Sequence, residues 1–220
     1  MGLLDINALL KEVSPESPCG EDLEYDLAFD ELQRAARGKP EEYSGHTVVK
    51  AAEPPNWREV RKLATELLGR TKDLRIGINM VQALVNLEGY LGLADGLSLL
   101  RGLLERYWDS VHPQLDPDDD NDPMMRMNIL VTLVDRVAML NVIRQTTLVN
   151  SRAIGRFSLH HIALSKGGEE VKGKGGDESV PDPAAIDAAF MDADIDELQA
   201  TTDAITRCSG DLAAIDAKLT

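Results

Sequence analysis

The chain has 220 residues, of which 43% are hydrophobic and only 4% aromatic, and its formal net charge is −15. An acidic chain of this kind is not expected to bind nucleic acid, because phosphate binding requires a basic surface. The longest uncharged, mostly apolar run covers residues 76–87, which is well below the ~20 residues that span a bilayer. We therefore expect no membrane insertion.

The two cysteines and the N-terminal residues indicate where the protein resides. Cys19 and Cys208 are far apart in the sequence, which does not suggest a disulfide framework and suits a reducing compartment. The N-terminal residues have neither the basic region nor the long apolar stretch of a secretory signal. The sequence thus predicts a cytoplasmic protein.

Residues 3–56 contain two short amphipathic segments separated by turns. Residues 3–10 predict a short helix that ends before Ser14 and Pro15, and a turn region rich in proline and glycine follows. Asp26 predicts the N-cap of a second helix that stops at Gly38. Residues 40–56 contain four prolines and glycines in total and predict a long loop.

Residues 56–116 hold the strongest helical periodicity, in three leucine-rich segments separated by glycine. The first begins after the cap Asn56 and stops at Gly69, the second covers about residues 73–89, and the third covers residues 93–111. Each segment is too apolar to stand alone in water, so the three must pack on one another. The pattern predicts antiparallel helical hairpins.

The remaining sequence predicts an acidic loop, further helices and a linker. A proline-bracketed loop at 116–123 precedes a fourth long helix to about residue 148, with one apolar face formed by Met127, Leu130, Val131, Val134, Val137 and Ala138. Residues 151–165 predict a short final helix. A Gly-rich linker then leads to two acidic helices, at 183–192 and 195–219, whose thin apolar stripe requires a partner surface.

Strand signals are scarce, because no sustained two-residue alternation of β-branched or aromatic residues occurs. We therefore expect an all-α fold, a multi-helix bundle of antiparallel helical hairpins with a smaller helical extension. The predicted domains are a helical domain at 1–165, a flexible Gly-rich linker at 166–182 and an acidic helical extension at 183–220.

The acidic residues near 116–122 form the candidate partner-binding surface. Its members share an acidic side chain in or beside the loop: Asp109, Asp116, Asp118, Asp119, Asp120 and Asp122. A calcium-binding hand needs glycine at its sixth position and glutamate at its twelfth. Counting from Asp116 or from Asp118 places neither residue there. A solvated loop and a docking site for a basic partner are the two interpretations that stay open.

Catalytic patterns are weak. The adjacent His160 and His161 point to different faces of any regular element, and the sequence contains no HExxH, CxxC, GxSxG or nucleotide-binding glycine motif. Cys19 as a nucleophile would need a base, and His46 is the nearest histidine in sequence, so a buried structural thiol is favoured. We expect no catalytic residue, no metal site and no cofactor.

Three groups of residues resemble the ImpA N-terminal domain, which is found in the TssA family of type VI secretion systems. The first is Ser17-Pro18-Cys19-Gly20-Glu21-Asp22-Leu23-Glu24-Tyr25-Asp26, and the second is Pro55-Asn56-Trp57-Arg58-Glu59-Val60. The third runs from Thr71-Lys72-Asp73-Leu74-Arg75 through Tyr107-Trp108 to His112-Pro113-Gln114-Leu115-Asp116-Pro117-Asp118. The resemblance covers about residues 14–165, in order and at family-like spacing.

This resemblance implies a non-enzymatic assembly protein, located at the cytoplasmic face of a contractile secretion machine. Its expected partners are baseplate, sheath or tube proteins, and the full-length parent is expected to form a homo-oligomeric ring through a missing C-terminal region. The shared positions are expected to determine the fold: Pro18, Cys19, Gly20, Trp57, Asp73, Arg75, Trp108, His112, Pro113 and Asp116.

Two alternative functions stay open at this point. The first is a divalent-metal-binding helical domain, calcium-regulated or hydrolytic, that uses the 116–122 loop together with His112. The second is a passive spacer that presents a C-terminal ring-forming region. Trp57 and Trp108 are expected to pack in the core, whereas an exposed Trp108 beside the acidic loop would indicate a binding hot spot.

Overall fold

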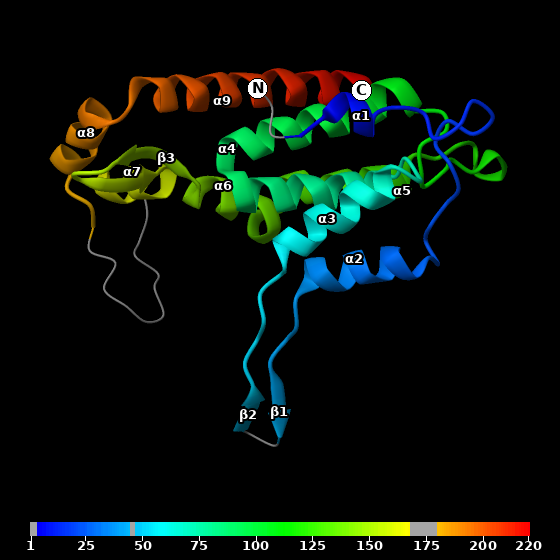
Figure 1. The fold of residues 1–220 in the computed structure, drawn as a ribbon, viewed down its shortest axis with the longest axis horizontal. Helices are drawn as coiled ribbons and strands as arrows, with labels where there is room; N and C mark the ends of the chain where they lie inside the picture. The colour runs from blue at the N-terminus through cyan, green and yellow to red at the C-terminus, as the bar shows by residue number, and fades with distance from the viewer. Residues whose placement is uncertain (1–3, 45–46, 168–179) are drawn as a thin grey trace.

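The computed structural model describes residues 4–44, 47–167 and 180–220, and it is mainly helical (Figure 1). Its α-helices are α1 (Ile6–Leu9), α2 (Leu27–Arg37), α3 (Trp57–Leu68), α4 (Leu74–Tyr107), α5 (Met124–Leu130), α6 (Asn141–Gln145), α7 (Leu159–Ser165), α8 (Pro183–Asp192) and α9 (Ile195–Leu219). Its strands are β1 (Glu42–Ser44), β2 (Thr47–Lys50), β3 (Thr147–Ser151) and β4 (Gly155–Ser158). Shorter helical turns are η1 (Pro117–Asp119), η2 (Val131–Val134) and the π-turn η3 (Arg136–Leu140).

Helices α2 and α3 begin and end where the sequence predicts. The side chain of Asp26 accepts a hydrogen bond from the Ala28 amide at 2.8 Å, and α2 ends at Gly38. The side chain of Asn56 accepts one from the Glu59 amide at 3.3 Å, and α3 ends at Gly69. These caps satisfy amide groups that have no partner within a helix, which explains why the two boundaries are readable from sequence.

Helix α4 contains both central leucine-rich segments and folds back at Gly89. That residue has φ +63° and ψ −139°, a conformation that only glycine adopts without strain. The two halves then face each other, because Gly77 in the first half lies against the side chains of Leu100 and Leu103 in the second. Most of the leucines, valines and isoleucines of both halves are buried, so α4 forms the centre of the hydrophobic core.

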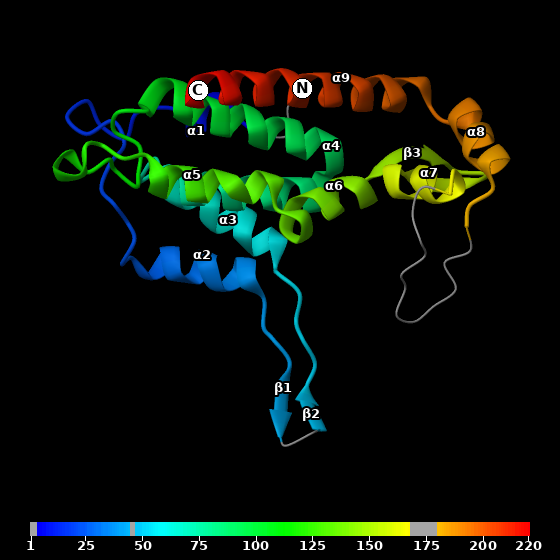
Figure 2. The same ribbon diagram turned by 180° about the vertical axis from the view of Figure 1, so that it is seen from behind.

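Helix α9 packs along the second half of α4, at the top of Figures 1 and 2. Polar contacts fix this packing, since Arg207 pairs with Asp95 at 2.5 Å and Asp211 accepts from Ser98 at 2.5 Å. The apolar stripe of α9 joins the same core cluster through its buried members Ala204, Cys208 and Ile215. Helix α4 is therefore the surface that covers the thin stripe of α9. Below α4, α3 and then α2 complete the stack.

The prediction of one long helix over 124–148 is wrong. The backbone leaves helical geometry at Asp135, where ψ is 129°, and this carboxylate accepts hydrogen bonds from the amides of Val137 and Ala138 at 2.9 and 2.6 Å. An aspartate that caps a new turn competes with a continuous helix. The helix already changes from α to 3₁₀ geometry in η2, before this break, so the predicted apolar face is divided, and Val131, Val134 and Val137 are exposed.

The all-α prediction is confirmed in part, because the described residues are mainly helical but also form short strands. Strands β1 and β2 pair as an antiparallel hairpin inside the predicted 40–56 loop, and this hairpin projects away from the helices in Figure 1. Strands β3 and β4 pair between residues 147 and 158, so only α7 of the predicted 151–165 helix forms. These strands have three to five residues each, which is too short to show a two-residue period.

Two further expectations concern the linker and the membrane. Most of the predicted Gly-rich linker, residues 168–179, lies outside the described residues. Among the helices of the described ranges, none has the length and apolar character needed to cross a bilayer.

Candidate interaction surface and the junction beneath it

The acidic loop has a defined conformation that its own aspartates stabilise. Asp116 precedes η1, and its side chain accepts a hydrogen bond from the Asp118 amide at 2.9 Å. Asp122 accepts one at 2.9 Å from the amide of Met124, the first residue of α5. The Asn121 amide donates to the carbonyl of Asp116 at 2.9 Å, which closes the loop on itself. Two of the predicted surface residues, Asp116 and Asp122, therefore also shape the loop.

The other predicted acids project from this frame. Asp109, just after the end of α4, is exposed, and so are Asp118 and Asp120 in the loop. The backbone of Asp119 belongs to η1, and its side chain is outside what the structure describes. The loop thus brings several carboxylates together on one edge of the molecule, where they create a local negative potential.

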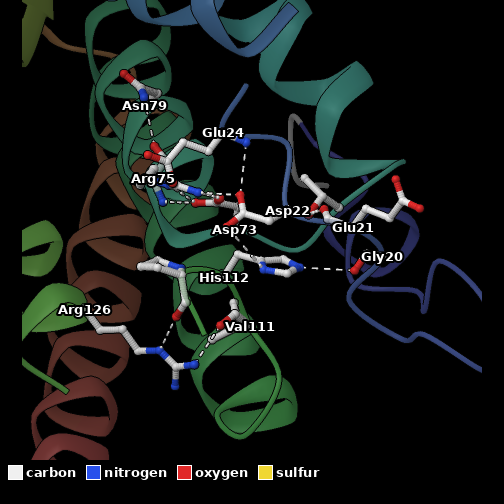
Figure 3. Close-up of polar contacts among 12 residues, drawn as sticks. Gly20, Glu21, Asp22, Glu24, Asp73, Arg75, Asn79, Val111, His112 and Arg126 are labelled. Carbon is white, nitrogen blue, oxygen red and sulfur yellow. Dashed lines mark hydrogen bonds and ion pairs between the residues drawn. The ribbon is translucent and has the colours of Figure 1, made fainter. Parts of the chain in front are cut away.

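Arg126 is the only lysine or arginine of the sequence between 107 and 135, and it is fully buried. Figure 3 shows its guanidinium beside Val111. Its guanidinium donates to the carbonyl of Pro113 at 2.8 Å, to that of Val111 at 2.7 Å and to that of Trp108. It also stacks on the Trp108 ring, with 5.0 Å from its central carbon to the ring centroid. Burial lowers the pKa of Arg126.

This arrangement makes Arg126 the residue that joins α5 to the end of α4. A planar guanidinium with five donors can satisfy several carbonyl groups at once, which an ammonium group cannot do. Sequence reasoning missed this role. The available signal was a single arginine just after an acidic loop and within a mostly apolar segment.

Asp73 and Arg75 form a second polar cluster at the start of α4. Asp73 caps the helix by accepting from the Arg75 amide at 2.7 Å, and its carboxylate also binds the Arg75 guanidinium at 2.7 Å. The same guanidinium pairs with Asp22 at 2.9 Å and with Glu24 at 3.1 Å. It lies over the ring of Phe29, 4.9 Å from the centroid. These contacts attach the 19–29 segment to α4.

His112 connects three segments in the same junction. Its amide donates to the Lys72 carbonyl and its carbonyl accepts from the Leu74 amide, both at 2.9 Å, and the peptide bond to Pro113 is cis. Its Nε2 atom is 3.1 Å from the carbonyl oxygen of Gly20, as Figure 3 shows. The imidazole is therefore directed at the Pro18-Cys19-Gly20 turn.

Gly20 has a steric reason to be glycine. Its φ is +68°, and a Cβ atom built there would lie 2.2 Å from the carbonyl oxygen of Arg70. No other residue fits a backbone approach this close at a positive φ. This position pairs with Thr71 in an isolated antiparallel bridge, so the motif turn is held against the start of α4.

Cys19 is buried in the same region, beside Ser110. Its sulfur is 3.2 Å from the Ser110 hydroxyl oxygen, and burial raises the pKa of the thiol. His46, the base considered from the sequence, lies outside the described residues. The neighbouring Lys72 is also buried, which lowers its pKa, and its ammonium donates to the carbonyl of Leu68 at 2.5 Å.

The remaining predicted positions lie at the edge of the core. Trp57 and Trp108 are half-buried and pack against the core cluster, so neither ring is fully enclosed. Pro18 is half-buried, and its carbonyl accepts from the Val13 amide at 2.9 Å. The expectation that both tryptophans are core residues therefore holds only in part.

The geometry gives no support to the metal-binding alternative. The Nε2 atom of His112 faces the Gly20 carbonyl, and the carboxylates of Asp116 and Asp122 accept from the backbone amides of Asp118 and Met124. Across 4–44, 47–167 and 180–220, no group of three or more His, Cys, Asp or Glu side chains is arranged to hold a metal ion.

Comparison with known proteins gives a family assignment. A family model described as ImpA, N-terminal, type VI secretion system, matches residues 10–135. The type VI secretion system component TssA1 of Pseudomonas aeruginosa is 49% identical over 203 residues, which are 92% of this chain and 57% of that protein. The chain thus spans little more than half the length of this curated relative.

A solved structure is similar over nearly the whole chain. It is the N-terminal domain, including the conserved ImpA_N region, of the TssA component of the type VI secretion system from Burkholderia cenocepacia. The TM-score is 0.73 at 26% sequence identity, and the match covers 98% of this chain and 82% of that one. The matched family region also contains the 17–26 turn, the start of α4, and the 107–122 segment. The chain belongs to the ImpA N-terminal family of type VI secretion systems.

Proposed function

We propose that the chain is a non-enzymatic interaction module that docks baseplate, sheath or tube components during assembly of a type VI secretion system. Family membership supports the link to this machine. The observation that carries the docking role is the set of exposed aspartates at 109–122, which project from a loop fixed by its own backbone contacts. The module acts at the cytoplasmic face of the machine.

Physical reasons favour docking over a merely solvated loop. A negative surface steers basic partners during diffusional encounter and selects against acidic ones. The loop is already held in one conformation by its capping aspartates, and the segment before it by Arg126, so little ordering entropy is lost on binding. A ring-forming C-terminal region and homo-oligomerisation of the full-length parent stay predictions.

The passive spacer is the alternative that the experiment must separate from docking. We would measure the affinity of residues 1–220 for purified baseplate, sheath and tube proteins of the same system, at low and high salt. The test variant is Asp118→Asn with Asp120→Asn, and the matched control is Asp187→Asn, an exposed acid on α8. A docking surface predicts a loss of about 2- to 30-fold at low salt, because each exposed charge contributes ~0.2–1 kcal/mol.

High salt should remove most of this difference, since exposed charges are screened. A spacer predicts equal affinity for parent, double variant and control at both salt concentrations. Absence of binding to every purified component would count against the docking role of this chain.

A further inference from the structure

An exposed apolar strip begins directly after the acidic loop. It consists of the residues Met124, Val131, Val134 and Val137, which are 58%, 57%, 66% and 77% exposed. Aliphatic side chains at this exposure are individually common on protein surfaces, but four within 14 consecutive positions form a patch. Val131 and Val134 lie in the 3₁₀ turn η2 and Val137 follows the break at Asp135, so none of the three continues the buried face of α5.

The local geometry places these side chains on one face. Met124 and Val131 are seven residues apart, which is two turns of an α-helix. Val131 and Val134 are three residues apart in the 3₁₀ turn η2, where such pairs lie directly above one another. Val131 and Val137 then line the same shallow hollow, of about 380 Å³, on either side of Asp135. The strip is therefore continuous, and a rise of about 1.5 Å per residue makes it about 20 Å long. The hollow lies at its Val137 end.

The charges at the two ends of the strip are opposite. The exposed aspartates of the loop, Asp118 and Asp120 among them, lie before Met124, and Arg126 is buried and does not offset them at the surface. The exposed Arg136 lies beside Val137 at the other end. Asp135 faces the hollow, but its carboxylate is engaged by the amides of Val137 and Ala138.

We propose that this strip binds an amphipathic helix of a protein partner, with aliphatic side chains facing the valines and lysine or arginine over the acidic loop. This proposal rests on the docking function proposed above and specifies the partner's chemistry. A helix of about four turns covers the length of the strip. The basic side chains of the partner helix lie over Asp118 and Asp120, and its other end lies over Arg136.

Charge also disfavours the other occupants of an apolar face. A second copy of this chain carries the same net charge of −15, and a bilayer with anionic lipids repels such a surface. Both occupants are outcomes that the experiment distinguishes.

The first test uses a synthetic 18-residue helical peptide with leucine on one face and lysine toward its C-terminal end. Its counterpart replaces every lysine by glutamate. The strip variant of the 1–220 chain is Val131→Ser with Val134→Ser and Val137→Ser. Its control is Met191→Ser with Ile195→Ser, two apolar residues that are 88% and 78% exposed near the α8–α9 connection. Circular dichroism melts verify that all variants fold.

We expect the lysine peptide to bind the parent and the control variant with equal affinity. It should bind the strip variant at least 10-fold more weakly, and the glutamate peptide should bind none of them. The loss in the strip variant should persist at 500 mM salt, because apolar contacts are not screened. Equal binding of the lysine peptide to parent and strip variant would overturn the proposal. Equal binding of the two peptides to the parent would also overturn it.

The second test places a photo-crosslinking amino acid at position 134 and presents the chain to the purified secretion components, to itself and to anionic vesicles. A crosslink to an amphipathic, basic helical segment of a component supports the proposal, whereas a crosslink to a second copy or to lipid overturns it. A component that loses affinity for the Asp118→Asn, Asp120→Asn variant but not for the strip variant overturns this inference and leaves the docking function standing. If neither variant weakens binding to any component, both proposals fail.

Discussion

Replacing Arg126 by methionine should destabilise the protein by about 2–4 kcal/mol. The guanidinium donates to three backbone carbonyl groups, at Trp108, Val111 and Pro113. Hydrogen bonds from a charged donor contribute ~1.5–3 kcal/mol each, so their loss costs roughly 5–9 kcal/mol before any offset. Methionine recovers several kcal/mol of that, because no charge is buried any longer and its chain retains much of the apolar packing.

Urea unfolding at equilibrium, followed by circular dichroism, measures this loss. A change of about 3 kcal/mol lowers the midpoint by about 1 M at the slope expected for a domain of this size. Arg126→Lys retains the charge but not the planar guanidinium group. It should lose at least half as much stability as Arg126→Met. Arg136→Met is the matched control on the surface and should stay within ~0.5 kcal/mol. If Arg126→Met and Arg136→Met unfold at the same midpoint, the three carbonyl contacts contribute nothing and the reasoning fails.

Four smaller predictions concern the junction, the core and the acidic loop. Trp108→Ala should cost about 2–3 kcal/mol in urea unfolding, less than a fully enclosed ring, because the indole is half-buried; an unchanged midpoint would refute its packing role. Gly20→Ala should lower the melting temperature by several degrees, since the φ of +68° and the Arg70 carbonyl leave no room for Cβ. Asp118→Asn should leave the melting temperature unchanged. Burial raises the pKa of Cys208 to about 11, so at pH 8 its thiolate should be about 100-fold scarcer than in the unfolded chain, and Ellman's reagent should react fast only after unfolding.

Helix boundaries were predictable where a local capping signal and a periodic apolar stripe coincide. Asn56 and Asp26 each cap a helix that begins at the next residue. Gly89 reverses the chain between two leucine-rich segments. Each of these signals depends on residues within one or two helical turns. Local physics therefore determined the central part of the fold, and sequence reasoning recovered it.

The helix break at Asp135 could not be predicted, because the competing structures have similar local energies. Residues 124–148 have adequate helix propensity and an apolar period, and a single aspartate within them is a weak signal. The decisive contacts are distant in sequence, such as the Tyr90 hydroxyl that donates to the Ile143 carbonyl at 3.1 Å. The same limit explains the β3–β4 hairpin, whose pairing is only four or five residues long.

The candidate surface was predictable as a cluster of acids but not as a surface with an apolar part. The cluster of aspartates at 109–122 is evident from the sequence alone, and Asp109, Asp118 and Asp120 are exposed in the structure. The valines at 131, 134 and 137 read as core residues in any continuous helix. Only the change from α to 3₁₀ geometry at η2, followed by the break at Asp135, shows that they lie outside.

Trp108 provides a physical link between the C-terminal extension and the acidic surface. The Lys218 ammonium near the end of α9 lies 5.9 Å from the centroid of this ring, and the guanidinium of Arg126 stacks on the same ring. Arg126 in turn holds the backbone that precedes the loop. Because Ala204, Cys208 and Ile215 of α9 belong to the same core cluster as α4, loss of α9 would expose that core and remove one contact of Trp108. The segment after the Gly-rich region thus supports the proposed docking surface even though it is distant from it in sequence.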